Sequence, residues 1–181
     1  MSNRFNAMMR NKEMQNDGFT DFCKECNEIL PEPQHYTEIG AWKGESAVIA
    51  SNYFKKITSI DPYPNENMSV VREEYLKNTK HIQDCTLIEQ TSDTAVKLFD
   101  NMSIDVLYID GDHTYEGCKK DVELWWPKLR VGGLFSGHDY KNRPRNNKEA
   151  KRAVDEYFDK LGITVNKTMG ERCPSFWWIK E

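Results

Sequence analysis

Long apolar runs are missing from this 181-residue chain, and no stretch approaches the ~20 apolar residues that span a bilayer. Residues 1–15 are too polar for the core of a signal peptide. The five cysteines are odd in number and widely spread, which excludes a disulfide-rich framework. A basic excess is also absent, with 25 Lys and Arg against 29 Asp and Glu. We therefore expect a cytoplasmic protein with neither a membrane nor a nucleic-acid partner.

The chain begins with a polar stretch and a predicted helix over residues 17–30. Cys23 and Cys26 lie on the apolar side of that helix. A zinc site needs four ligands and no second pair stands at a suitable spacing, so we expect both cysteines to pack in the core. The length and the 38% hydrophobic content suit one domain, 1–181, with a helical N-terminal segment over 1–34 and a core over 35–181.

Strand and helix patterns alternate along that core. Apolar runs predict strands at 36–39, 57–61, 86–90, 104–110, 132–139, 163–169 and 175–180. Amphipathic patterns predict helices at 44–54, 67–80, 92–100, 114–129 and 147–162. This order predicts an α/β fold, a doubly wound and mostly parallel sheet of about seven strands that ends in an antiparallel hairpin.

The loop after the first predicted strand, 38–46, contains glycines but does not suit a phosphate. A dinucleotide fingerprint places glycine where Trp42 stands, and a P-loop would follow Gly44 with lysine rather than Glu45. An acid at the start of a helix also repels phosphate where the helix dipole would attract it. The loop therefore favours a nucleoside-like ligand that carries no phosphate there.

Asp61 ends the second predicted strand, where a carboxylate can accept hydrogen bonds from both ribose hydroxyls. A ribose-binding acid beside a loop hostile to phosphate indicates S-adenosylmethionine. The alternative is that Gly40 and Gly44 only permit a tight turn and that Asp61 is a capping residue.

Three segments, 38–46, 57–63 and above all 109–140 with IDGDHTYEGCKKD and GGLFSGHDY, resemble the class I S-adenosylmethionine-dependent methyltransferases. The similarity is to the small-molecule and sugar O-methyltransferase-like branch with an IDGDHSYE-type motif, and it implies the Rossmann-like class I fold. It also implies that the cofactor contacts Glu38, Gly40, Trp42, Gly44, Ser46, Asp61, Ser92 and Asp110. In that assignment Asp61 holds the ribose, Ser92 contacts adenine and Asp110 faces the sulfonium.

Acidic and imidazole side chains follow the fourth and fifth predicted strands, whose ends lie close together in such a sheet. Asp110, His113 and His138 are the candidate catalytic residues, since imidazole can act as a general base near neutral pH. Metal-dependent relatives place ligands at the positions of Asp110, His138 and Asp139, so Mg²⁺ or Mn²⁺ is an open alternative. Asp112 is expected to cap the following helix.

We predict methyl transfer to a hydroxyl of a sugar or other small molecule. One rival is an NAD-type oxidoreductase, which Trp42 disfavours; another is a non-catalytic module that binds a cofactor or partner. The basic residues Lys141, Arg143 and Arg145 are expected in a solvated loop or a wall over the substrate site. The aromatic segment 175–180 is compatible with a homo-oligomer.

Overall fold

The computed structural model describes residues 17–30, 32–33, 35–143, 148–168 and 173–181. The predictions for residues 1–16 and for Arg145 lie outside these ranges. None of the described helices combines the length and the apolar character needed to cross a membrane.

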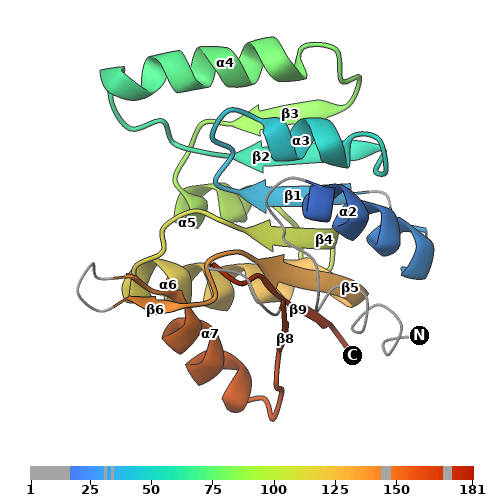
Figure 1. Cartoon of the computed structure of the whole chain (residues 1–181), viewed down its shortest axis with the longest axis vertical. Helices are drawn as coiled ribbons and strands as arrows, with labels where there is room; N and C mark the ends of the chain where they lie inside the picture. Colours follow the sequence, from blue (N-terminus) through green and yellow to red (C-terminus); the bar gives the residue numbers. More distant parts are fainter. Residues whose placement is uncertain (1–16, 31, 34, 144–147, 169–172) are drawn as a thin grey trace.

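A seven-stranded sheet runs through the molecule in the order β3-β2-β1-β4-β5-β9-β8 (Figure 1). The first five strands along the chain pair in parallel, and β9 runs antiparallel to both β5 and β8. The bounds are β1 His35–Ile39, β2 Lys56–Ile60, β3 Cys85–Ile88, β4 Ile104–Ile109, β5 Leu129–Gly137, β8 Asn166–Lys167 and β9 Phe176–Ile179. The predicted doubly wound α/β fold with an antiparallel C-terminal hairpin is confirmed.

Helices cover both faces of this sheet because each central strand buries side chains on both sides. In β4, Tyr108 faces a core shared with α2 and α3, whereas Leu107 faces a core shared with α6 and α7. The helices are α2 Asp17–Ile29, α3 Glu45–Ala50, α4 Ser69–Thr79, α5 Ser92–Ala95, α6 Tyr115–Trp125 and α7 Ala150–Asp159. Cys23 and Cys26 are fully buried on α2, as predicted, and neither forms a disulfide.

Several helices are shorter than their sequence patterns because 3-10 turns take over at their ends. These turns are η1 Glu66–Met68, η2 Val96–Leu98 and η3 Trp126–Lys128. The helix predicted from residue 147 begins at Ala150, since the residues before it form β7 (Lys148–Glu149) and pair with β6 (Asn142–Arg143). This small hairpin follows the fifth strand, and its pairing was not predicted.

Candidate active site

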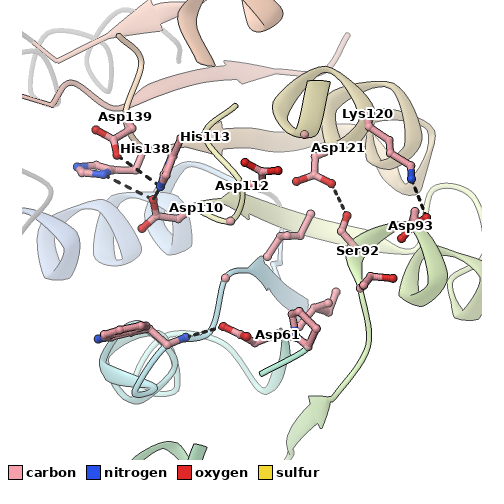
Figure 2. Close-up of a pocket in the computed structure, with 18 residues that line it drawn as sticks. Asp61, Ser92, Asp93, Asp110, Asp112, His113, Lys120, Asp121, His138 and Asp139 are labelled. Atoms are coloured by element: carbon pink, nitrogen blue, oxygen red, sulfur yellow. Dashed lines mark hydrogen bonds and ion pairs between the residues drawn. The ribbon is translucent and has the colours of Figure 1, made fainter. Parts of the chain in front are cut away.

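A cavity of about 710 Å³ lies across the carboxyl ends of β1, β2, β4 and β5 and against α5 and α6 (Figure 2). That volume is within the usual range for a small-molecule site. Five residues of the predicted cofactor set line it: Gly40, Trp42, Asp61, Ser92 and Asp110. Ser46 lines a neighbouring cavity, while Glu38 and Gly44 line neither of these two.

Gly40 is the point where the ends of three strands converge. Its N–H donates to the Ile60 carbonyl at 2.9 Å, and the Asp110 N–H donates to the Ile39 carbonyl at 2.8 Å. A Cβ on Gly40 would lie 2.2 Å from the Asp110 carbonyl oxygen, and its φ of +92° suits glycine alone. Glycine therefore lets the loop over 38–46 cross the end of β4 and brings Asp110 beside that loop.

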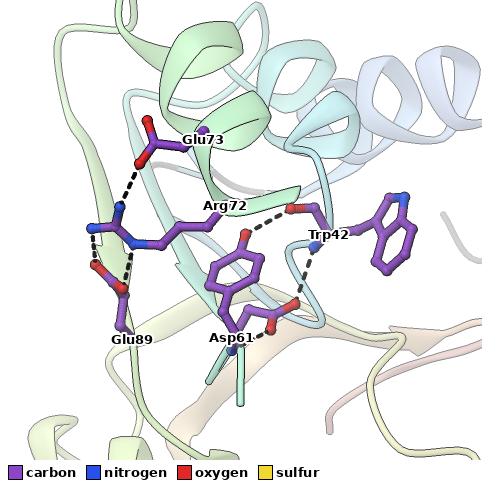
Figure 3. A network of polar contacts seen from close by, with 6 residues as sticks. Trp42, Asp61, Arg72, Glu73 and Glu89 are labelled. Carbon is purple, nitrogen blue, oxygen red and sulfur yellow. Dashed lines mark hydrogen bonds and ion pairs between the residues drawn. The ribbon is translucent and has the colours of Figure 1, made fainter. Parts of the chain in front are cut away.

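The backbone of Trp42 is held on both sides by the end of β2 (Figure 3). Asp61 accepts hydrogen bonds from the backbone N–H of Trp42 at 3.1 Å and of Tyr63 at 3.0 Å. The Tyr63 hydroxyl donates to the Trp42 carbonyl at 2.6 Å. These contacts hold Trp42 at a left-handed φ of +44°, and the residue stays 57% exposed at the cavity. Each oxygen of Asp61 retains a lone pair for a ligand hydroxyl.

An ion pair near the contacts of Trp42 with Asp61 and Tyr63 joins α4 to the chain after β3. Arg72 Nε and Nη2 donate to the two carboxylate oxygens of Glu89 at 2.6 and 2.8 Å, and Nη1 reaches Glu73 at 3.1 Å. Both side chains are partly exposed, so we expect this ion pair to contribute little to the free energy of unfolding.

Glu38 is buried at the end of β1 and does not line either cavity. Its carboxylate is 1% exposed and accepts hydrogen bonds from Ser59 Oγ at 2.6 Å and Tyr36 Oη at 3.1 Å. Burial raises the pKa of Glu38 to about 7, although hydrogen bonds from Ser46, Ser59 and Tyr36 oppose that shift. In the described structure Glu38 therefore supports the loop from below.

Four side chains predicted from the loops after β4 and β5 come together in the cavity (Figure 2). His113 Nε2 lies 3.7 Å from Asp110 Oδ1 and 3.4 Å from Asp139 Oδ2, and His138 Nδ1 lies 3.6 Å from Asp110 Oδ1. Burial alone would raise the pKa of Asp139, but the Cys173 thiol and the nearby His113 imidazole bring it below its usual value.

The same cluster has the composition of a divalent-metal site. Ligand atoms of Asp110, His113 and Asp139 all lie within 4.8 Å of one another. His138, which the sequence analysis placed in the metal set, is not part of this group and is buried at 7% exposure. Its place is taken by His113, which comes from the loop before α6. The His113 carbonyl accepts a hydrogen bond from the Glu149 N–H at 3.1 Å, so β7 helps to position that loop.

Negative charge predominates in the cavity. Six carboxylates line it, namely Asp61, Asp93, Asp110, Asp112, Asp121 and Asp139. Among the described lining residues Lys120 is the one lysine or arginine, and its Nζ pairs with Asp93 at 2.7 Å. This field opposes phosphate and favours a cation, in agreement with the features of the loop over 38–46.

Two side chains in the loop before α6 accept hydrogen bonds from backbone N–H groups at the start of that helix. Asp112 Oδ1 accepts a hydrogen bond from the Thr114 N–H at 2.9 Å, and Thr114 Oγ1 accepts one from the Gly117 N–H at 3.1 Å. Thr114 is thus the N-cap, and Asp112 supports the turn before it. A Cβ on Gly117 would lie 2.4 Å from the Asp112 carboxylate, so glycine makes room for that side chain.

Sequence reasoning missed Asp121, a buried carboxylate on α6 that lines the cavity. The Ser92 hydroxyl donates to Asp121, and the Trp125 indole N–H donates to Ser92 Oγ at 2.8 Å. Burial raises the pKa of Asp121 to about 6. The available signal was a single acid among Cys118, Val122 and Trp125 on the apolar side of the helix.

A second cavity of about 500 Å³ adjoins the first on the side of α2 and α3. The two share Gly40, Trp42, Asp110 and His138. The remaining wall includes apolar side chains, Phe19, Ile49 and Tyr108, together with Ser46 and two charged residues of the loop. The two cavities therefore border each other at these four residues.

Comparison with known proteins matches residues 37–140 to the family model described as a methyltransferase domain. Two curated relatives are the uncharacterized protein y4gI of Sinorhizobium fredii, 27% identical over 61% of this chain, and the uncharacterized protein R132 of Acanthamoeba polyphaga mimivirus, 29% identical over 59%. The matched regions span 14% and 52% of those relatives. The fold is similar to that of an O-methyltransferase from Bacillus cereus in complex with SAH, with a TM-score of 0.69, 11% identity and coverage of 98% of this chain and 88% of that one.

Proposed function

Because this chain belongs to the methyltransferase-domain family, we propose that it is an S-adenosylmethionine-dependent O-methyltransferase that acts on a hydroxyl of a sugar or other small molecule. One observation carries the proposal. The acidic cavity has the Asp61 carboxylate at the end of β2 and the imidazole–carboxylate cluster around Asp110 at the ends of β4 and β5.

The residues present fit the proposed cofactor. Asp61 would accept hydrogen bonds from the ribose hydroxyls, the loop from Gly40 to Ser46 would hold the methionine end, and Asp110 would face the sulfonium. When bound, S-adenosylmethionine supplies an electrophilic methyl group, whose bond to sulfur breaks as the acceptor oxygen bonds to carbon. The negative field of the cavity favours a cationic ligand over a phosphorylated one such as NAD.

His113 is the base that the geometry supports best. Its Nε2 would take the proton of the acceptor hydroxyl, and the carboxylates of Asp110 and Asp139 within 3.7 Å would stabilise the resulting imidazolium. His138 is the second candidate, since it lines both cavities and its Nδ1 lies 3.6 Å from Asp110.

The alternative is a metal-assisted version of this activity, which the cluster of Asp110, His113 and Asp139 supports. These groups would hold Mg²⁺ or Mn²⁺, with the imidazole suiting the softer ion, and the ion would lower the cost of forming the alkoxide. His113 Nε2 cannot bind a metal and accept a proton at once. In the metal-assisted version the proton would pass to His138 or to solvent.

The acceptor would enter the second cavity and present its hydroxyl beside Asp110 and His138. The apolar wall of Phe19, Ile49 and Tyr108 suits the carbon skeleton of a small molecule or one face of a sugar ring. A nucleic-acid acceptor is disfavoured by the acidic lining of the neighbouring cavity. The segment 175–180, which was expected to be compatible with a homo-oligomer, contains β9 between β5 and β8, and its Phe176 and Trp177 side chains are buried, so these two rings are not available for pairing with a second copy.

Calorimetry with S-adenosylmethionine, its demethylated product SAH, and NAD tests the cofactor assignment. We expect saturable binding of the first two and none of NAD; binding of NAD alone would overturn the proposal. A screen of hydroxylated small molecules for SAH release then identifies the acceptor. Turnover that survives EDTA treatment would eliminate the metal-assisted version, whereas loss of turnover and its recovery with Mg²⁺ or Mn²⁺ would establish it.

A further inference from the structure

Ser92, which the family resemblance assigns to adenine, already uses its hydroxyl within the protein. Its proton is donated to Asp121 Oδ1, and its oxygen accepts the Trp125 indole N–H at 2.8 Å. A hydroxyl has one proton to donate. Ser92 Oγ therefore cannot donate to a ring nitrogen of a bound base without releasing Asp121.

Asp121 has an oxygen to offer instead. The residue is 5% exposed and lines the larger cavity, and its Oδ1 is the oxygen that Ser92 holds. Among the described residues no hydrogen bond is made to Oδ2. Figure 2 shows the carboxylate projecting from α6 toward Ser92, across the cavity from the strand end that carries Asp61. An ionised carboxylate only accepts hydrogen bonds, so the ligand atom that meets Oδ2 has to be a donor.

The position of Asp121 relative to Asp61 identifies that donor. If the ribose bound to Asp61, the attached base would lie in the part of the cavity between that strand end and α6, which Ile60, Pro62 and Gly117 also line. The other acids nearby are committed, Asp93 to Lys120 at 2.7 Å and Asp112 to the turn before α6.

We propose that Asp121 recognises the exocyclic amine of adenine, and that Ser92 and Trp125 act as positioning residues that fix the direction of its carboxylate. This assignment rests on the proposed function and adds the residue that selects the base. A hypoxanthine base carries a carbonyl oxygen in place of the amine. That oxygen would face the Asp121 carboxylate with no proton between them, so the site rejects it.

The experiment uses calorimetry at pH 7.5 to compare SAH with S-inosylhomocysteine, whose base has a carbonyl in place of the amine and a proton on the adjacent ring nitrogen. We expect the wild type to prefer SAH by at least about 100-fold, as sites built around one polar contact do. In Asp121→Asn the amide can donate to a carbonyl, and the preference falls by at least about 10-fold. Glu123→Gln, which removes an exposed carboxylate from the same helix, serves as the matched control and keeps the wild-type preference.

The outcomes separate this inference from the function on which it rests. If the wild type binds neither ligand, the proposed function fails. If the wild type binds SAH and Asp121→Asn keeps the full preference for it, Asp121 is only a structural partner of Ser92 and the inference is wrong. Far-ultraviolet circular dichroism and a thermal melt establish whether the variant is folded.

The wild type provides a second measurement that does not depend on the variant. Burial raises the pKa of Asp121 to about 6, with Asp112 and Asp93 adding to the shift and Lys120 opposing it. Below that pH the protonated carboxyl can donate to a carbonyl, so the preference for SAH shrinks between pH 7.5 and pH 5. Because the two ligands differ only in the base, the ratio of their dissociation constants is unaffected by groups that titrate elsewhere in the protein. A ratio that is constant with pH contradicts the inference.

Discussion

Replacing Glu38 by glutamine should change how the stability of this protein depends on pH. The carboxylate is 1% exposed, and burial raises its pKa to about 7 from an ordinary value of 4.5. A carboxyl whose pKa is higher in the folded state binds more protons when folded, so stability falls as the pH rises from 4.5 to 7 and is level above that. A shift of 2.5 units at 1.36 kcal/mol each amounts to about 3 kcal/mol.

Glu38→Gln removes this titration and keeps the shape of the side chain. The free energy of unfolding, measured with urea at several pH values from 4.5 to 8, should therefore rise in the variant relative to the wild type by about 3 kcal/mol over that interval. Asp121 titrates in the same direction, but it is present in both proteins and cancels in the difference. The variant also alters the hydrogen bonds to Ser59 and Tyr36. Any loss of stability from that change is the same at every pH, so it does not alter how the difference in unfolding free energy varies with pH.

Glu28→Gln is the control, because it removes an exposed carboxylate from α2. Its difference from the wild type should vary little with pH. A flat difference for Glu38→Gln as well would refute the conclusion that Glu38 is buried with a raised pKa, and the account of the loop support would have to be withdrawn.

Three further perturbations test the site. Asp61→Asn should weaken SAH binding at least about 10-fold in calorimetry, because one acceptor oxygen of a charged hydrogen-bonding group is lost; equal affinity would remove Asp61 from the cofactor site. His113→Ala should abolish SAH release in single-turnover assays while SAH still binds, and His138→Ala should behave this way instead if His138 is the base. Gly40→Ala should lower the melting temperature sharply or prevent folding, since its Cβ would lie 2.2 Å from the Asp110 carbonyl oxygen; a melt like that of the wild type would show that the strand ends can separate.

The fold, and the position of five of the proposed cofactor residues at one cavity, could be predicted from local sequence because their signals are local. The run over 104–110 is apolar since a central parallel strand is buried on both faces, and it was recognised as a strand for that reason. Gly40 and Asp61 were identified because each stands directly after a strand, and strand ends meet at one edge of a parallel sheet. The pairing of β6 with β7 was missed because each strand has two residues, too few to show the alternation of apolar and polar residues that predicts a strand.

Tertiary packing decided which side chains act together. Along the sequence His113 and His138 were both candidate bases and only His138 was placed in the metal set. The path of the loop before α6 places His113, rather than His138, within reach of both Asp110 and Asp139. Ser92 and Asp121 are separated by 29 positions and meet because α6 packs beside α5. The sequence by itself determined which loops follow strands and carry the candidate functional side chains, since the repeat of apolar residues and the turn residues that end it are local features of the chain. The orientation of each side chain within the cavity depends on contacts between distant segments, and only the folded chain establishes those.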